Sequence, residues 1–369
     1  MNLSHLPRMS RRRFVAGAGA ALSTPAIWRA RADELPRLRD LGAAKGIEVG
    51  SAFSLDPDPK YRAVIADHCA VITPEWQMKP PQIKSNAASP YDFTIVDRFF
   101  DFAARHGQKV HGHTLYWSYV PIDWAVGATF EETTKLYGDF IRTVARRYPQ
   151  VETWDVMNEL VDDESWKLKT DYLVGQYGYD FIDFCLRTAR EAAPQARLAI
   201  NDYWIECATE LCEGKRGGVM DMLKRLKSMG SPLDALGLQS HLYTRMPVDP
   251  GATYDLINDG AGLGLESWVS ELDVNDSTLP ADIVERDGLV ADIYERYLTG
   301  VLRHPAVKRV IFWGISDYYN WIVYDKKHWD QRPPEMGEAR PALFDTNNDP
   351  KPAFHAVARA LRQAPPRMS

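Results

Sequence analysis

Cysteine is scarce in this chain of 369 residues, and no two cysteines have the spacing of a metal site. The four are Cys69, Cys185, Cys207 and Cys212, and no C-x-x-C pattern occurs. Cys207 and Cys212 are close enough in sequence to pair in an oxidising compartment, but spacing alone does not establish the required geometry. We favour the unpaired state for both, and the sequence predicts neither a metal nor a cofactor.

Long hydrophobic runs are also absent. The apolar run at residues 16–26 is too short to span a bilayer. It follows Ser10-Arg11-Arg12-Arg13-Phe14-Val15, which fits the twin-arginine export pattern, and it precedes Ala30-Arg31-Ala32, a small-x-small cleavage site. We therefore expect residues 1–32 to be a signal peptide for export to the periplasm or beyond, and residues 33–369 to be the catalytic domain. The alternative for the first segment is a disordered basic tail.

The chain also lacks an excess of basic charge. Residues 1–32 contain six Arg and no other charged residue, so their removal leaves 38 basic and 50 acidic residues and changes the formal net charge from −6 to −12. Nucleic acid and anionic membranes are therefore not expected partners. A neutral substrate is compatible with this charge, and we expect a monomer that does not insert into a membrane.

Short apolar runs recur about every forty residues and are typical of buried strands. They are residues 46–50, 70–73, 109–114, 153–158, 197–201, 235–240, 267–271 and 310–314. Apolar residues at helical spacing fill gaps between them, at residues 91–106, 130–148, 179–193, 220–229 and 282–304, and again at 352–361. This alternation predicts an α/β fold, a single (β/α)8 TIM barrel. A doubly wound sheet would call for a Gly-rich phosphate loop after the first strand, and the sequence has none.

Two glutamates at strand ends are the strongest functional signal. Glu159 closes the run at residues 153–159, and Glu271 closes the run that begins at Ser267. Burying an unpaired carboxylate costs several kcal/mol, so packing alone does not explain either one. In a parallel barrel these strand ends form the active-site face. Two carboxyl groups in one cleft are what hydrolysis of a glycosidic bond requires, although an ion pair with Lys or Arg is the alternative for each.

The surroundings of the two glutamates differ, and this difference assigns their roles. Nearby tryptophans favour an apolar site for Glu159, which would raise its pKa, so we assign it as the general acid/base. His241, one strand away, and Asp273 can hold Glu271 ionised and oriented, so we assign Glu271 as the nucleophile. The carboxyls should then lie roughly 5–5.5 Å apart, with retention of the anomeric configuration.

Other polar residues fall at or just beyond the predicted strand ends. They are Glu75, His113, Asn158, Asn201, Asp202, Gln239 and Asp317. A ring of helix N-caps would explain some of the Asp and Asn residues, but not Gln, His and Glu in the same ring.

Ordered motifs along the chain resemble glycoside hydrolase family 10, the endo-β-1,4-xylanases, over nearly all of residues 40–362. The motifs are residues 73–79, 112–117, 154–159, 201–203, 237–242, 270–274, 312–317 with Trp321, and 343–345 with 350–354. The resemblance implies a retaining enzyme that hydrolyses xylan, a β-1,4-linked polysaccharide, or its oligosaccharides by double displacement. It also implies substrate-binding roles for Glu75, Lys79, His113, Trp117, Asn158, Gln239, Trp313 and Trp321.

Four places depart from the family pattern. Trp76 and Trp204 stand where Asn is usual, Ser118-Tyr119 replaces a longer segment, and Asn320 replaces Ser. An indole in place of an amide removes a hydrogen bond to the sugar and adds a stacking surface, so selection for that hydroxyl weakens. Our hypothesis is a preference for another β-linked glycan, such as a glucan or a bacterial exopolysaccharide.

Three other classes of protein compete with this interpretation. A different barrel glycosidase would share the two glutamates but not the motifs at residues 75–79 and 237–241. A metal hydrolase could use His111, His113 and His241, although the sequence shows no Asp/His cluster that completes such a site. A non-catalytic polysaccharide-binding barrel would keep the aromatic residues and lose one glutamate.

Overall fold

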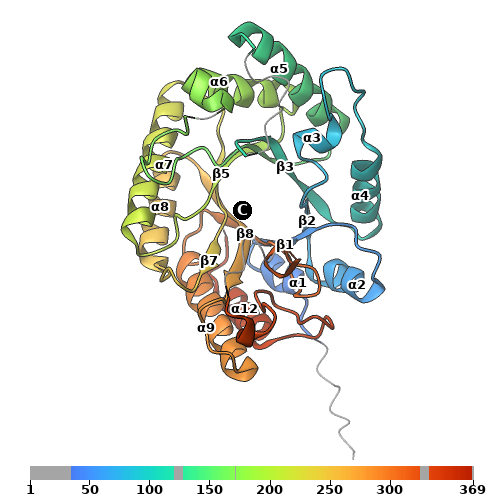
Figure 1. The fold of residues 1–369 in the computed structure, drawn as a ribbon, viewed down its shortest axis with the longest axis vertical. Helices are drawn as coiled ribbons and strands as arrows, with labels where there is room; N and C mark the ends of the chain where they lie inside the picture. The colour runs from blue at the N-terminus through green and yellow to red at the C-terminus, as the bar shows by residue number, and fades with distance from the viewer. Residues whose placement is uncertain (1–34, 120–127, 171, 325–331, 368–369) are drawn as a thin grey trace, which may run out of the picture. The chain divides into compact units, whose positions relative to one another are not determined.

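A closed ring of parallel strands lies inside a ring of helices (Figure 1). The structure, a computed structural model, describes residues 35–119, 128–170, 172–324 and 332–367. The barrel strands are β1 (Glu48–Phe53), β2 (Val71–Pro74), β3 (Lys109–Trp117), β4 (Thr153–Asn158), β5 (Arg197–Asp202), β6 (Ala235–Leu238), β8 (Glu266–Asn275) and β9 (Val307–Phe312). A short strand, β7 (His241–Tyr243), pairs with the second half of β8. The predicted signal peptide lies outside the described residues.

Strand pairing confirms the predicted barrel. Neighbouring strands pair in parallel from β1 to β6, β9 pairs with β1, and β6 pairs with β8, which closes the ring. Each predicted apolar run overlaps one barrel strand. The doubly wound alternative is wrong, because a doubly wound sheet is open and this one closes on itself.

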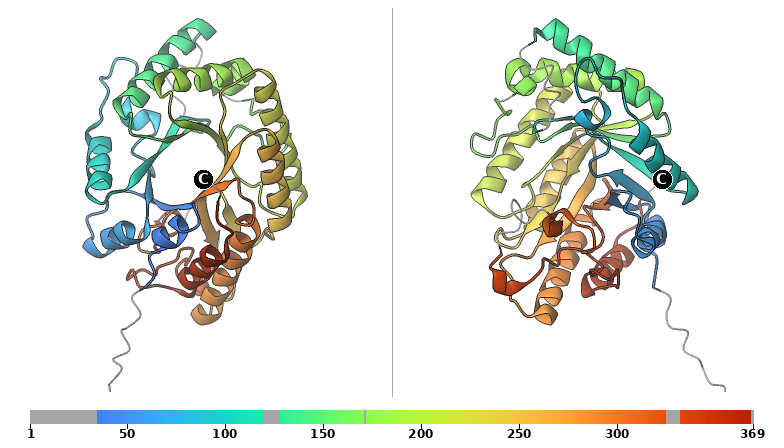
Figure 2. Two further views of the ribbon diagram at one scale, coloured as in Figure 1. Left: turned by 180° about the vertical axis from the view of Figure 1, so that it is seen from behind. Right: turned by 45° about the vertical axis from the view of Figure 1, so that its right-hand side comes forward.

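The helices follow the strands around the outside of the barrel, as both views in Figure 2 show. They are α1 (Leu38–Ala43), α2 (Pro59–His68), α3 (Pro80–Ile83), α4 (Thr94–Arg105), α5 (Phe130–Arg147), α6 (Tyr172–Ala192), α7 (Glu210–Ser228), α8 (Pro250–Gly262), α9 (Ile283–Val301), α10 (Trp321–Tyr324), the 3-10 turn η2 (Pro334–Met336) and α12 (Pro352–Gln363). Among the described residues, no helix is both long and apolar enough to cross a membrane.

Several helices differ from the sequence prediction, and α1, α2, α3 and α10 were not predicted. The helix α7 begins ten residues earlier than predicted, because the Thr209 side chain accepts a hydrogen bond from the Cys212 N–H and caps it. Gly178, with φ 58°, breaks α6 where the predicted helix was expected to begin. The helix α8 was not predicted, although it starts with Asp249 as N-cap and Pro250 at the first helical position.

Large side chains fill the barrel interior below the strand ends. Trp268 is almost fully buried there, whereas the equally buried Trp154, between the inward-facing Thr153 and Asp155, points to the outer face of β4. A Cβ atom on Gly112 would lie 2.2 Å from the Trp154 ring, so only glycine leaves room for this indole. The Arg309 guanidinium lies 5.3 Å from the Trp268 ring and pairs with Glu48, which closes the floor of the barrel. The C-terminal strand ends therefore remain as the open face.

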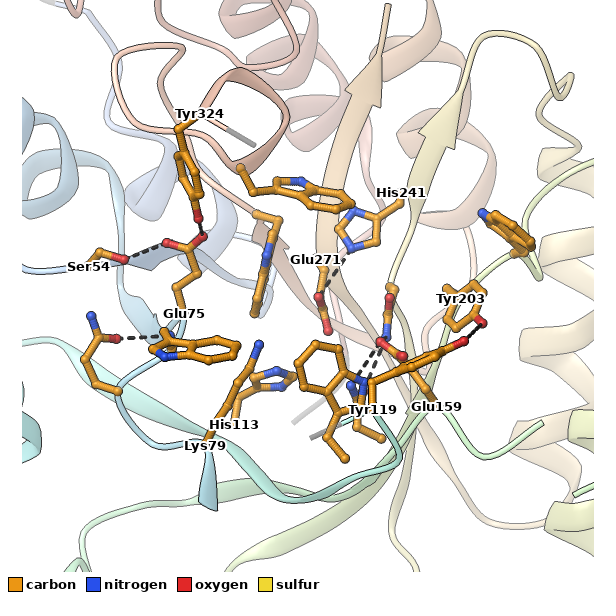
Figure 3. A pocket seen from close by; sticks show the side chains of 18 of the residues that line it. Ser54, Glu75, Lys79, His113, Tyr119, Glu159, Tyr203, His241, Glu271 and Tyr324 are labelled. Carbon is orange, nitrogen blue, oxygen red and sulfur yellow. Dashed lines mark hydrogen bonds and ion pairs between the residues drawn. The ribbon is translucent and has the colours of Figure 1, made fainter. Parts of the chain in front are cut away.

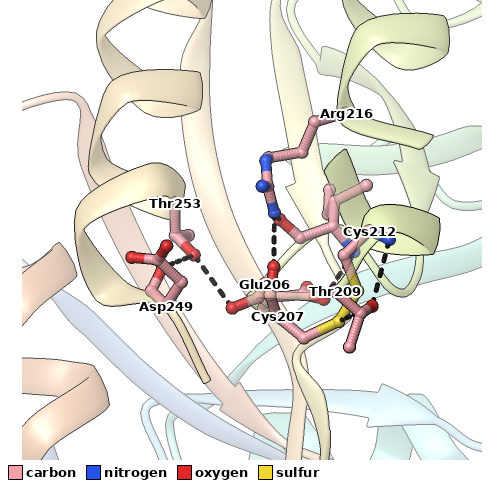
Figure 4. Close-up of a disulfide and its surroundings, with 8 residues drawn as sticks. Glu206, Cys207, Thr209, Cys212, Arg216, Asp249 and Thr253 are labelled. Atoms are coloured by element: carbon pink, nitrogen blue, oxygen red, sulfur yellow. Dashed lines mark hydrogen bonds between the residues drawn. A yellow bond between two sulfur atoms is a disulfide. The ribbon is translucent and has the colours of Figure 1, made fainter. Parts of the chain in front are cut away.

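A disulfide joins Cys207, in the loop after β5, to Cys212 in the first turn of α7, with a Cα–Cα distance of 5.5 Å (Figure 4). The preference for unpaired cysteines was therefore wrong at this pair. Spacing alone did not reveal it, because the cap at Thr209 turns the chain and brings the two cysteines together. Cys69 and Cys185 are free and buried.

Candidate active site

A cavity of about 840 Å³ opens at the C-terminal ends of the strands (Figure 3). Both predicted catalytic residues line it, with every other predicted site residue except Asp273. These lining residues are Glu75, Trp76, Lys79, His113, Trp117, Asn158, Glu159, Trp204, Gln239, His241, Glu271, Trp313 and Trp321. Asp273 lies behind His241. The barrel thus gathers into one site side chains that are almost 250 residues apart in sequence.

Glu159 follows β4 in a left-handed backbone conformation, with φ 61°. Its N–H donates to the Asn201 carbonyl at 2.8 Å, and its Oε1 accepts from Gln239 Nε2 at 2.9 Å and from Asn158 Nδ2 at 3.2 Å. Burial raises the pKa of Glu159, although the positive charge of Lys169 and the Gln239 amide oppose this rise. A raised pKa suits a group that must hold a proton before it donates it.

Glu271 lies on β8, and hydrogen-bond donors face both of its oxygens. Asn201 Nδ2 donates to Oε1 at 2.6 Å, and His241 Nε2 lies 3.4 Å from Oε2. The other His241 nitrogen, Nδ1, lies 2.9 Å from Asp273 Oδ1. Burial alone would lower the pKa of His241, but the Asp273 and Glu271 carboxylates raise it to about 10. His241 is therefore an imidazolium that orients Glu271 and neutralises charge beside it.

One amide network joins the two glutamates. Asn158 Oδ1 accepts from Asn201 Nδ2 at 3.0 Å and from Gln239 Nε2 at 3.3 Å, and these same amides donate to Glu271 and Glu159. Asn201 belongs to the predicted ring of polar strand ends, but the sequence did not identify it as a partner of Glu271. Its position at the end of β5 was the available signal.

His113 forms part of the cavity wall, and the buried Asp155 carboxylate holds its ring in place. His113 Nδ1 and His111 Nε2 each lie 2.9 Å from Asp155 Oδ2. Burial would raise the pKa of Asp155, but the two histidines hold it below its usual range. Both histidines of the H-x-H pair, His111 and His113, therefore contact the same buried carboxylate. Across the described part of the chain, no group of three or more His, Cys, Asp or Glu side chains could hold a metal ion.

One end of the cavity combines a buried lysine with two indoles. Lys79 Nζ lies 4.7 Å from the Trp76 ring and 4.0 Å from the Trp117 ring. Glu75 lies nearby, and its two oxygens accept hydrogen bonds from Ser54 Oγ, at 2.6 Å, and from Tyr324 OH. Trp76 remains 44% exposed, so its ring is available for stacking on a substrate.

The opposite end of the cavity is an aromatic wall. Tyr119 OH lies 3.2 Å from Tyr203 OH, and the Tyr203 hydroxyl donates to Asp163 Oδ2 at 3.0 Å. Trp204 packs edge-on against Tyr203 and Tyr243. Flat rings in this arrangement offer faces on which sugar rings could stack.

Several lining residues were not predicted from the sequence. They are Ser54, Gln77, Asp163, Tyr243, Tyr319 and Tyr324. Ser54, Asp163 and Tyr319 lie in loops outside the recognisable motifs, while Tyr243 ends β7 and Tyr324 ends α10. For these residues only the folded arrangement shows that they reach the cavity. Asn320, one of the departures from the family pattern, donates to the Trp313 carbonyl at 2.9 Å and accepts from the Ile322 N–H at 2.9 Å. It therefore fixes the turn that carries Trp321.

The closed barrel and the glutamate pair in its mouth define a barrel glycoside hydrolase. A model of one such family, Glycosyl hydrolase family 10, matches residues 37–360, and the chain belongs to this family.

Several relatives are known xylanases. The chain is 30% identical to endo-1,4-beta-xylanase B of Thermotoga neapolitana over 338 residues, which cover 88% of this chain and 92% of that protein. It is 31% identical to a beta-1,4-xylanase of Dictyoglomus thermophilum, over 89% of this chain and 92% of that one. Among solved structures, xylanase 10B of Thermotoga petrophila RKU-1 in complex with xylobiose is 30% identical, with a TM-score of 0.80 over 89% of this chain and 98% of that chain.

Proposed function

We propose that this protein is a retaining endo-β-1,4-xylanase that hydrolyses xylan by double displacement. The observation that carries the proposal is the pair of buried glutamates in one cavity with opposite surroundings. Glu159 lies in a site that raises its pKa, whereas an imidazolium and an amide face Glu271. The xylanases to which the chain is similar support the choice of xylan as substrate.

The residues divide the reaction into two steps. In the first, a Glu271 oxygen bonds to the anomeric carbon while Glu159 gives its proton to the departing glycosidic oxygen. In the second, the Glu159 carboxylate takes a proton from water, the water oxygen bonds to the anomeric carbon, and the bond to Glu271 breaks. Asn201 and His241 hold Glu271 in place throughout, and the amide of Gln239 orients Glu159.

The direct test is hydrolysis of unsubstituted xylan, mixed-linkage glucan and cello-oligosaccharides by the purified protein. We expect xylan to be cleaved internally, and NMR of the first product should show the β-anomer, which mutarotates later. Release of the α-anomer first would contradict the double displacement. Absence of hydrolysis on every substrate would favour a polysaccharide-binding barrel instead.

The two substituted positions make another β-linked glycan the second candidate substrate. Trp76 is 44% exposed at one end of the cavity, and Trp204 lies in the aromatic wall at the other. Both add stacking surface where the resemblance implies an amide. Faster hydrolysis of mixed-linkage glucan than of xylan would support this candidate, and a clear xylan preference would remove it.

We also propose that the chain is exported by the twin-arginine route and acts as a monomer. The export proposal rests on the pattern at residues 10–15 and the cleavage site at residues 30–32. Replacing Arg11 and Arg12 by Lys should leave the protein inside the cell, whereas the unaltered chain should reach the periplasm or medium. Size-exclusion chromatography with light scattering tests the monomer.

A further inference from the structure

A buried lysine without a carboxylate partner lies behind the acid/base glutamate. Lys169 is only 6% exposed, and no carboxylate among the described residues forms an ion pair with it. Its Nζ contacts Ser118 Oγ at 3.2 Å and lies 4.0 Å from the Tyr119 ring and 5.6 Å from the Tyr203 ring. Burying an ammonium without an ion-pair partner is costly, so this position calls for an explanation. The carboxyls that respond to its charge are those of Glu159 and Asp162.

A short hairpin brings Lys169 back to the acid/base glutamate. The chain leaves Glu159, turns, and returns so that Val161 pairs with Leu168. The Lys169 N–H donates to the Leu160 carbonyl at 2.9 Å, immediately after Glu159. Lys169 is thus fixed by backbone contacts beside the catalytic residue, independently of where its side chain points.

The side-chain contacts complete this link. Ser118 Oγ donates to the Glu159 carbonyl at 2.8 Å and is also the polar contact of Lys169. The Tyr119 ring covers the ammonium, while the Tyr119 hydroxyl contacts Tyr203. Lys169 does not line the cavity. It can therefore act on the reaction through Glu159 and not by touching the substrate.

We propose that Lys169 is a positioning residue that stabilises the ionised form of Glu159. This role rests on the proposed function, in which Glu159 is the acid/base. The ionised form is needed in the second step, when the carboxylate must take a proton from water. Burial raises the pKa of Glu159, and Lys169 is the foremost of the groups that oppose this rise. The other titratable groups that act on Glu159 or respond to its charge are Glu271, Lys79, Tyr203 and Tyr243.

The test compares Lys169→Met with two controls. Lys169→Arg keeps the charge, and Lys167→Met removes an exposed charge from the same hairpin. Two quantities are measured in each protein: the alkaline limb of kcat/KM against pH, and the titration midpoint of the Glu159 carboxyl by 13C NMR. We expect both to move up by about one pH unit in Lys169→Met and to stay in place in the controls. Unmoved values in Lys169→Met, or an equal shift in Lys167→Met, would overturn the proposal.

A second variant tests the proposal even if Lys169→Met does not fold. Tyr119 is 52% exposed, so Tyr119→Ala should fold while it opens the ammonium to water. Water would screen the charge, and the Glu159 midpoint should move in the same direction by a smaller amount. An unmoved midpoint in a folded Tyr119→Ala protein would also overturn the proposal. The NMR titration needs no substrate, so its outcome is independent of whether the protein hydrolyses xylan.

Discussion

Glu159 and Glu271 are identical side chains with different neighbours, and single substitutions should separate their roles. Glu271→Gln should abolish hydrolysis on every substrate, because an amide cannot form the covalent glycosyl intermediate. Glu159→Ala should lose about 10²–10⁴-fold on xylan but keep much of its activity on aryl glycosides whose leaving groups need no proton. Steady-state kinetics on both substrate types measures the difference.

The matched control is Glu164→Gln, an exposed glutamate in the hairpin that follows Glu159. It should hydrolyse both substrates at the unaltered rate. If Glu159→Ala lost aryl-glycoside and xylan activity equally, the acid assignment would have to be given up. Residual hydrolysis by Glu271→Gln beyond contamination would remove the nucleophile assignment.

At the scale of single residues, the sequence predicted which side chains reach the cavity better than how they bond to one another. Glu159 and Glu271 were predictable because carboxylates are rare at the ends of buried strands. Asn201 was visible at the end of β5, but its contact with Glu271 depends on the curvature of the barrel. Lys169 gave no signal, since the hairpin that carries it forms through backbone pairing.

At the scale of elements, the hairpin after β4 is held against α7 by two glycines. A Cβ atom on Gly218 would lie 2.0 Å from the Trp166 carbonyl oxygen, and one on Gly214 would lie 2.1 Å from the Trp166 ring. Gly217, between them on the same helix, has nothing within 4 Å of its would-be Cβ. The pattern of glycines on α7 therefore matches the face that receives the hairpin.

Alanine at Gly218 and alanine at Gly217 should change the unfolding free energy in opposite directions. Gly218→Ala must push the hairpin away and should cost about 1–3 kcal/mol of unfolding free energy. Gly217→Ala meets no atom and should stabilise the protein by about 0.5–1 kcal/mol, because alanine favours a helix. Urea denaturation measures both. Equal effects in the two variants would show that α7 does not hold the hairpin in the way its contacts indicate.

Element boundaries show where sequence patterns lose information. The periodicity at residues 130–148 predicted α5 almost to the residue, because Thr129 and Glu132 form a capping box at its start. The predicted start of α7 was wrong, since the segment before residue 220 is rich in glycine and polar residues and has a weak apolar pattern. There the Thr209 cap and the disulfide decide where the helix begins.

At the scale of the whole molecule, the eightfold alternation was enough to predict the barrel, because few folds accommodate so many parallel strands. The aromatic wall at one end of the cavity was not predictable, since Tyr119 and Tyr203 follow β3 and β5, Tyr243 ends β7, and the three meet only after the barrel closes. The chemistry at the strand ends was therefore more predictable than the substrate-binding surface in the loops.

Buried groups with shifted pKa values make the stability depend on pH, and three of them have a raised pKa. Burial raises the pKa of Glu206 to about 7 and of Asp317 to about 6, despite opposing backbone hydrogen bonds and Lys351. Burial would lower the pKa of His241, but the Asp273 and Glu271 carboxylates raise it to about 10. In each case the folded protein holds its proton more tightly than the unfolded chain, so stability is present at low pH and is lost as pH rises. Asp155 and His68 act in the opposite sense, because a lowered pKa removes stability as pH falls. Burial lowers the pKa of His68 to about 4, so its contribution rises with pH between about 4 and 6.5.

These signs predict a maximum of the unfolding free energy near pH 4–5, a shallow decline up to about pH 6.5 where His68 opposes Glu206 and Asp317, and a steeper decline above it, continuing to about pH 10. Glu206 alone accounts for about 3 kcal/mol of the decline up to pH 7, since its pKa lies well above the ordinary 4.5. Urea denaturation at a series of pH values measures the curve. Glu206→Gln cannot ionise, so its curve should be flatter between pH 4.5 and 7 whatever its absolute stability. Unfolding free energy that rises from pH 5 to 8 in the unaltered protein would contradict the assignment of these protons to the folded state.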